Sequence, residues 1–309
     1  MVLIPVRRPV ASRTGAGIAA AIVLTVGCST SDTTGTQPEA ARLVATTTVW
    51  ADITSRVACG APVDALVPAG ADPHTYEVSL RDREAVTGAS VLVANGAGLE
   101  ASAGVLVDAA VDAGVAYVVV TDHLDLLDTD EHDDEHDDER DDEHGDPHVW
   151  LDPTLVIDVV DEIEAVLVES GFETCADDVE TDLARLDQEL AETLADVAPS
   201  DRILVTGHDS LAYFAERYDF EVLGAVIPST STLAEPSAGE LADLAELIED
   251  RSVRAIFTDA FETAVDADAL GERLGIPVVA LATGSVTDEA PTYAAMMTAN
   301  ARAIADALA

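Results

Sequence analysis

The chain has 309 residues, which is enough for two domains that each bury a core of their own. Hydrophobic residues make up 48% and aromatic residues only 4%, so the core of a globular fold must consist mainly of Ala, Val, Leu and Ile. Acidic residues number 60 against 15 basic residues, all of them Arg, and the formal net charge is −45. This balance argues against nucleic acid as a partner, because phosphate binding needs clustered positive charge.

The start of the chain has the pattern of an export signal. Arg7, Arg8 and Arg13 precede an apolar run at 18–26, which is shorter than the roughly 18 residues of a membrane-spanning helix. A glycine and Cys28 follow, and this ending resembles a bacterial lipobox, whose cysteine becomes the lipidated N-terminus. We expect an extracytoplasmic protein that a lipid holds at the cell membrane, with plain secretion or a periplasmic location as the alternative.

Two cysteines remain after the export signal, Cys59 and Cys175. An exported protein reaches an oxidising compartment, where the two thiols can form a disulfide. The sequence alone leaves three readings open: a disulfide, a pair of buried free thiols, or half of a metal site.

Short β-branched or apolar runs alternate with segments of helical composition, which is the order of a parallel sheet flanked by helices. The first series has strand-like runs at 43–49, 63–67, 90–94 and 117–121, with helical segments such as 51–58 and 101–113. The second series has strand-like runs at 202–206, 221–226, 253–258 and 277–282, with helices at about 209–217, 238–250 and 265–274.

The segment 176–197 lies between the two series and predicts one long helix. Apolar residues recur at three- and four-residue steps from Val179 to Leu194, which places them in one stripe. The expected fold is therefore α/β, with two Rossmann-like lobes of parallel strands joined by a rigid helix. The expected order is signal peptide 1–28, flexible tether 29–41, first lobe 42–175, linker helix 176–197 and second lobe 198–309.

An acidic insert at 122–146 interrupts the first lobe, and it holds four of the seven histidines. His123, His132, His136 and His144 lie among a dense run of Asp and Glu. Imidazole suits zinc and clustered carboxylates attract divalent cations, so these histidines are predicted as an auxiliary metal-binding loop. The alternative is a solvated insert in which the histidines have no role.

The other three histidines each stand at or beside the end of a strand-like run. They are His74 in Ala-Asp-Pro-His-Thr-Tyr-Glu, His148 in Asp-Pro-His-Val-Trp, and His208 in Thr-Gly-His-Asp. In open α/β sheets the ligand crevice lies beyond the carboxyl ends of the strands, where such side chains converge. We predict that the three imidazoles bind one metal ion.

These histidine motifs resemble those of the zinc- and manganese-type solute-binding lipoproteins of bacterial ABC importers. The segment 95–100, Asn-Gly-Ala-Gly-Leu-Glu, is similar to the Asn-Gly-Leu-Gly-Leu-Glu of that family, and 292–300 is similar to its closing helix. The resemblance implies a metal cleft between the lobes, with two histidines from the first lobe and His208 from the second. It also implies that the acidic insert belongs to zinc-type members, and that the partner is the permease of a membrane importer.

Three imidazoles favour Zn²⁺ over Mn²⁺, so we expect a monomeric zinc-binding protein, with manganese as the alternative. Many relatives carry an Asp ligand after the last strand, whereas this chain reads Leu-Ala-Thr-Gly-Ser at 281–285. Asp259 is therefore the candidate fourth ligand, with Glu262 and a water molecule as alternatives. Asp259 could equally cap the helix that follows it.

Two other classes of function remain in view. An exported zinc hydrolase also uses three histidines, but it needs a general base near the metal, and the His-Glu-x-x-His motif is absent. We therefore expect no enzyme. A surface adhesin is the third class, and no feature of the sequence excludes it as a second role.

Overall fold

The computed structural model describes residues 41–100, 103–128, 145–261 and 264–309. The predicted signal peptide, Cys28 and nearly all of the tether lie outside the described residues, as do His132, His136, His144 and Glu262. Within the described residues, no helix combines the length and the apolar character needed to cross a membrane.

The first lobe is built on a four-stranded parallel sheet with the order β2-β1-β3-β4. All of β1 and β3 is buried, which explains why these strands are continuous apolar runs in the sequence. Its strands are β1 (Leu43–Ala45), β2 (Val63–Ala65), β3 (Val91–Ala94) and β4 (Ala116–Val119), and its helices are α1 (Thr48–Val57), α2 (Leu80–Thr87), α3 (Ala103–Ala113) and α4 (Pro153–Glu169).

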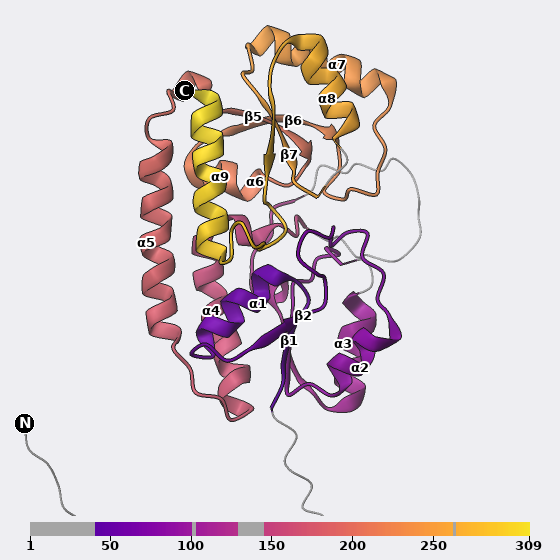
Figure 1. Ribbon diagram of the computed structural model, residues 1–309, viewed down its shortest axis with the longest axis vertical. Helices are drawn as coiled ribbons and strands as arrows, with labels where there is room; N and C mark the ends of the chain where they lie inside the picture. The colour runs from indigo at the N-terminus through magenta and orange to yellow at the C-terminus, as the bar shows by residue number, and fades with distance from the viewer. Residues whose placement is uncertain (1–40, 101–102, 129–144, 262–263) are drawn as a thin grey trace, which may run out of the picture. The chain divides into compact units, whose positions relative to one another are not determined.

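The second lobe repeats this topology, with parallel strands in the order β6-β5-β7-β8. Its strands are β5 (Ile203–His208), β6 (Glu221–Ile227), β7 (Ile256–Asp259) and β8 (Val278–Leu281), and its helices are α6 (Ala212–Tyr218), α7 (Ala238–Arg251), α8 (Val265–Leu274) and α9 (Tyr293–Leu308). Short 3-10 helices lie at Val120–His123, Val149–Leu151 and Pro199–Asp201 in the part of the chain that the structure describes. The predicted α/β fold with two parallel-sheet lobes is thus confirmed (Figure 1).

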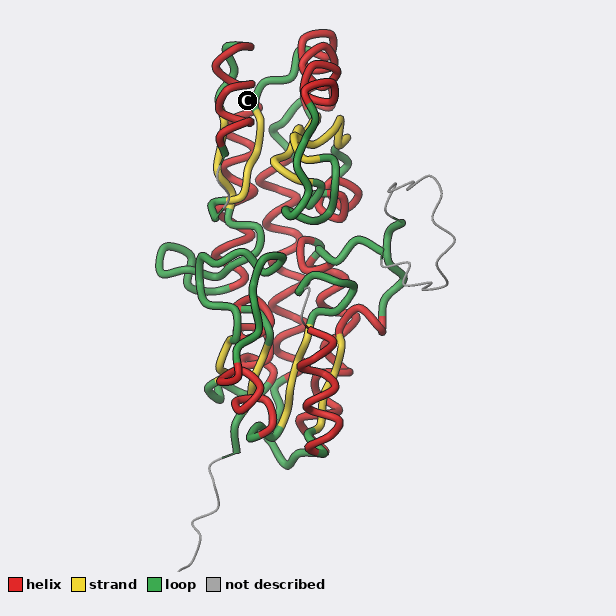
Figure 2. The backbone as a smooth tube through the Cα atoms, turned by 90° about the vertical axis from the view of Figure 1, so that its right-hand side faces the viewer, coloured by secondary structure: helices red, strands yellow, loops and turns green. Residues whose placement is uncertain are grey.

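The helix α5 (Ala176–Leu194) joins the two lobes and runs alongside both of them (Figure 1). Its predicted stripe is buried and packs against α4 and α9. A view from the side shows the strands in two separate groups, one in each lobe (Figure 2). The helix ends three residues earlier than predicted, and a short 3-10 helix begins at Pro199.

The largest apolar core is shared between the lobes through α5 and α9. Trp150 of the first lobe donates its indole N–H to the carbonyl oxygen of Thr283 in the second lobe, at 2.6 Å. The hydroxyl of Tyr293 donates to the carbonyl oxygen of Trp150, also at 2.6 Å. Buried contacts between the lobes therefore hold their facing loops in fixed positions relative to each other.

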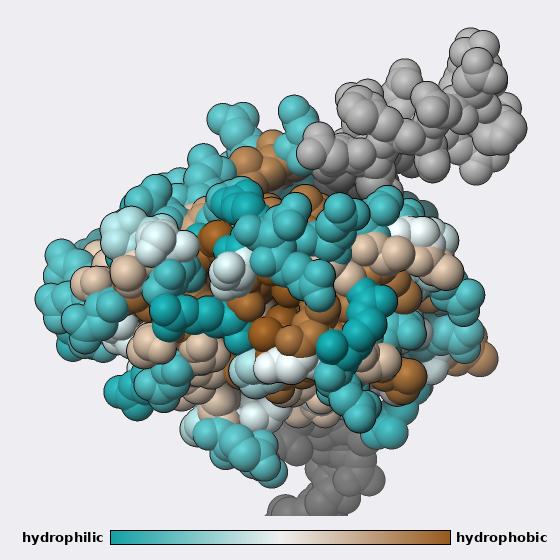
Figure 3. All heavy atoms as spheres, turned by 90° about the horizontal axis from the view of Figure 1, so that it is seen from above, coloured by the Kyte–Doolittle hydropathy of each residue, from teal (hydrophilic) through white to brown (hydrophobic). Residues whose placement is uncertain are grey.

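Hydrophilic residues cover much of the face seen from the end of the second lobe, with apolar residues gathered near its middle (Figure 3).

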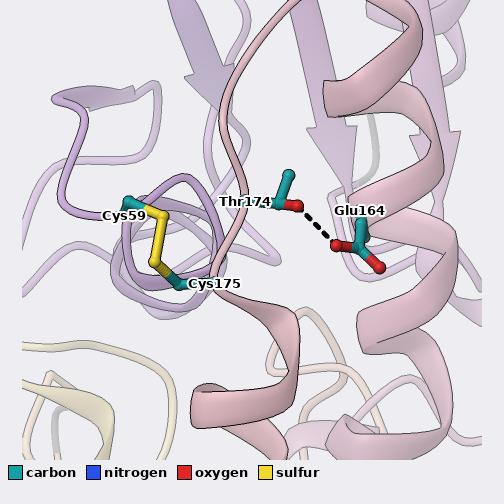
Figure 4. Close-up of a disulfide and its surroundings, with 4 residues drawn as sticks. All are labelled: Cys59, Glu164, Thr174 and Cys175. Atoms are coloured by element: carbon teal, nitrogen blue, oxygen red, sulfur yellow. Dashed lines mark hydrogen bonds between the residues drawn. A yellow bond between two sulfur atoms is a disulfide. The ribbon is translucent and has the colours of Figure 1, made fainter.

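Cys59 and Cys175 form a disulfide, which settles the three readings that the sequence left open. The sulfur atoms are 2.05 Å apart and the Cα atoms 5.2 Å apart. Cys59 follows α1 and Cys175 precedes α5, so the bond ties the first lobe to the start of the linker helix (Figure 4). The hydroxyl of Thr174 donates to Glu164 of α4 beside it, which holds the same connection against the neighbouring helix.

Candidate metal centre

Three buried imidazoles converge between the lobes. His74 lies in the loop that follows β2, His148 directly precedes the 3-10 helix at Val149–Leu151, and His208 is the last residue of β5. The Nε2 atom of His148 is 3.3 Å from Nε2 of His74 and 3.3 Å from Nε2 of His208. One nitrogen from each ring lies within 4.8 Å of the other two. The exposed fraction of each residue is 4% or less.

Carboxylates behind two of the rings set the proton positions. Asp146 Oδ1 is 2.7 Å from Nδ1 of His148, and Asp259 Oδ2 is 2.9 Å from Nδ1 of His208. A neutral imidazole has one N–H, and a carboxylate at Nδ1 holds that proton there. The Nε2 atoms of His148 and His208 then face each other as lone pairs, which repel unless a cation lies between them.

The distances fit a metal ion. Four ligands at about 2.0–2.1 Å in a tetrahedron lie about 3.3–3.4 Å from one another, and this is the usual geometry of zinc bound by imidazole. The two Nε2–Nε2 distances of 3.3 Å agree with that spacing. The three nitrogens can therefore occupy three corners of one coordination shell.

Burial keeps His74 in the protonation state that binds metal. The pKa of His74 is lowered to about 3, chiefly because burial disfavours the charged ring and also because His148 and His208 lie beside it. An imidazole with so low a pKa is neutral at neutral pH and offers a lone pair to a cation. Burial also raises the pKa of Asp146, to about 7.

A hydrogen-bond network fixes the backbone that carries His148. The side-chain amide of Asn95 donates to the carbonyl oxygen of Pro147 at 3.0 Å. The indole N–H of Trp50 donates to Oδ1 of Asn95 at 2.7 Å. The hydroxyl of Tyr213 donates to the carbonyl oxygen of Asp146 at 2.9 Å. His148 is thus positioned by residues of both lobes.

The turn after Asn95 requires glycine. Gly96 has φ +93°, and a Cβ there would lie 2.2 Å from the hydroxyl oxygen of Thr121. The Asn-Gly start of the segment 95–100 therefore has two separate causes. Asn95 supplies a side chain that forms hydrogen bonds, and Gly96 is needed because it has no side chain.

The structure places Asp259 differently from our expectation. Its carboxylate contacts Nδ1 of His208, whereas Nε2 of His208 is the nitrogen that faces His148. Among the described residues, the group that could hold a metal ion consists of His74, His148 and His208 and does not include Asp259. The alternative role as a helix cap is wrong, because the next helix begins at Val265 and Ala264 occupies its N-cap position. The segment 281–285 supplies no carboxylate to the centre either.

His123 lies apart from the three converging histidines. Its side chain is 37% exposed, and its Nδ1 is 3.7 Å from Oε2 of Glu162. Asp146 and Asn95 lie in sequence motifs near the histidines, but the sequence did not predict their roles. For Asp146 a signal existed, because a carboxylate two residues before a histidine can reach its ring.

A buried set of imidazoles between two α/β lobes defines a solute-binding protein whose solute is a metal ion. Residues 43–307 match the family described as zinc-uptake complex component A, periplasmic. The chain belongs to this family of extracytoplasmic metal-binding proteins of ABC importers, and its members are solute-binding proteins.

Named relatives differ in the metal that they bind. The manganese-binding lipoprotein MntA of Halalkalibacterium halodurans is 28% identical over 90% of this chain and 92% of its own length. The zinc-binding protein TroA of Treponema pallidum is 28% identical over 86% of this chain and 88% of its own, and its solved structure superposes with a TM-score of 0.72 at 25% identity, covering 87% of this chain and 99% of that structure. The iron lipoprotein MtsA of Streptococcus pyogenes serotype M1 is 26% identical over 93% of this chain and 95% of its own.

Proposed function

We propose that this protein captures Zn²⁺ outside the cytoplasm and delivers it to the permease of an ABC importer. The observation that carries the proposal is the convergence of three buried imidazoles at a spacing that suits tetrahedral coordination. Nitrogen ligands favour zinc over manganese, which prefers oxygen. The acidic insert before His148 supports the same metal, because histidines lie among its carboxylates.

Metal uptake by cells with and without the gene tests this function. We expect loss of the gene to abolish the uptake of radioactive zinc at low external concentration and to leave manganese uptake unchanged. Loss of manganese uptake alone would assign the protein to manganese and contradict the proposal.

We further propose that Cys28 becomes the lipidated N-terminus and that the mature protein is a monomer that docks on the permease. The support is the apolar run before Cys28 and the word lipoprotein in the names of relatives such as MntA. The centre lacks a general base of the hydrolase type among its described lining residues, which favours binding over catalysis.

The carboxylate behind His208 gives a prediction of its own. Asp259→Asn keeps the shape and a hydrogen-bond acceptor but removes the charge that polarises the ring. We expect zinc affinity to fall about 10- to 100-fold, the usual effect of such outer residues, with the fold unchanged. Competition with a zinc chelator measures this change. Glu262→Gln tests the alternative ligand in the same way, and a larger loss in that variant than in Asp259→Asn would make Glu262 a ligand instead.

The acidic insert is proposed as a collector of divalent cations. Deleting 128–143 should leave the tight centre nearly unchanged, remove additional weak sites and slow metal capture mainly at low salt, because salt screens the attraction of dense negative charge. Titration calorimetry and stopped-flow capture rates at two salt concentrations measure both effects. A large loss of affinity at the tight centre would show that the insert contributes a principal ligand, and capture rates that never change would make it a solvated insert.

A further inference from the structure

The space around the three imidazoles has an apolar wall. Besides the histidines, it is lined by Pro73, Leu99, Trp150, Phe261, Thr283 and Gly284. The one indole N–H in this wall donates to the carbonyl oxygen of Thr283, so it is already engaged. Among these described lining residues there is no carboxylate and no thiol, and the space between their side chains does not admit a water molecule. The described part of this wall therefore offers no carboxylate and no thiol to the fourth corner of the coordination shell.

Phe261 and Gly284 close the wall together. A Cβ on Gly284 would lie 2.9 Å from Cε1 of Phe261, 3.4 Å from its Cζ, and 3.7 Å from Cδ of Pro73. The phenyl ring thus rests on the backbone of Gly284 and takes the space into which any longer side chain there would project. Glycine at this position is explained by the ring, since the backbone of Gly284 is not in the left-handed region.

We propose that Phe261 is a selectivity-determining residue, whose ring on Gly284 keeps water and carboxylate oxygens away from the metal. This inference rests on the proposed metal centre. A metal that accepts few, mostly nitrogen ligands is retained under such a cover, whereas a cation that seeks six ligands rich in oxygen cannot complete its shell. Exclusion of oxygen ligands by an aromatic ring then works beside the three imidazoles to disfavour manganese.

Removing the ring tests the proposal. In Phe261→Ala we expect manganese to bind at least about tenfold more tightly and zinc to change much less, so that the ratio of the two affinities falls; outer residues commonly shift metal affinity by this amount. Phe261→Leu is the matched control, because leucine keeps a large apolar side chain over the metal centre. The ratio of its zinc and manganese affinities should stay close to that of the unmodified protein. Chelator competition gives both dissociation constants.

Two further measurements make the result specific to oxygen ligands. Water-proton relaxation of the manganese-loaded proteins should be faster for Phe261→Ala than for Phe261→Leu, because bound waters replace the ring. In the double variant Phe261→Ala/Gly284→Asp the space left by the ring admits a carboxylate, and manganese affinity should rise again. Gly284→Asp alone should impair binding of both metals, because its side chain collides with Phe261.

The outcomes separate this inference from the proposed function. An unchanged ratio in Phe261→Ala, with zinc still bound tightly, would overturn the role of Phe261 and leave the zinc centre standing. Failure of the unmodified protein to bind zinc at all would overturn both. Phe261 is only partly buried, and metal-free thermal unfolding checks that each variant remains folded.

Discussion

Replacing any one of His74, His148 or His208 by Ala should lower zinc affinity by orders of magnitude while the fold remains intact. Each variant leaves two imidazole ligands, whereas zinc sites in proteins usually have three or four protein ligands. The metal-free fold should tolerate the change, because removal of one ring also removes lone-pair repulsion within the cluster. Isothermal titration with zinc, beside a thermal unfolding curve of the metal-free protein, measures both effects.

His123→Ala is the matched control for these variants. It removes an imidazole that is partly exposed and lies apart from the three, so the affinity of the tight centre should not change. Tight binding that survives in any of the three cluster variants would show that the corresponding ring is not a ligand.

The second large effect concerns the disulfide. Changing Cys59 and Cys175 together to Ser should lower the free energy of unfolding by about 4 to 5 kcal/mol, because the bond closes a long loop and so restricts the unfolded chain. The two cysteines are 116 residues apart in sequence, which puts this bond among those with a large expected effect. Chemical denaturation of the metal-free protein under non-reducing conditions measures the difference.

The reduced form of the unmodified protein is the control for the disulfide. With a strong reductant present its unfolding curve should approach that of the double Ser variant, since both then lack the cross-link. A difference below about 1 kcal/mol between the oxidised protein and the variant would contradict the chain-restriction argument.

Much of the fold could be predicted because buried parallel strands are continuous apolar runs. The strands β1 and β3 follow this rule over their whole length, β5 and β7 follow it in their first residues, and the stripe on α5 predicted the linker. The helix α2 was not predicted because it is largely polar and buries only Ala85 and Val86. The helix α4 was also missed, although its buried residues from Val156 to Leu167 recur at three- and four-residue steps and carried the signal.

The strand-end argument holds for His208, which is the last residue of β5. It does not describe the other two histidines, because His74 lies in the loop after β2 and His148 directly precedes a 3-10 helix. The role of Asp259 could not be predicted. It ends β7, and β7 pairs with β5, whose last residue is His208. Neighbouring strand ends put the carboxylate within reach of the ring, but the sequence does not tell which ring nitrogen it meets. The contact of Phe261 with Gly284 joins two loops and leaves no periodic signal.

X-ray absorption at the zinc edge, on protein loaded with one equivalent of zinc, tests the central claim most directly. The account predicts three imidazole ligands at about 2.0–2.1 Å and no sulfur. The same spectrum in any one of the three His→Ala variants should lose one imidazole or the bound zinc altogether. A shell with fewer than three imidazoles in the unmodified protein would contradict the account.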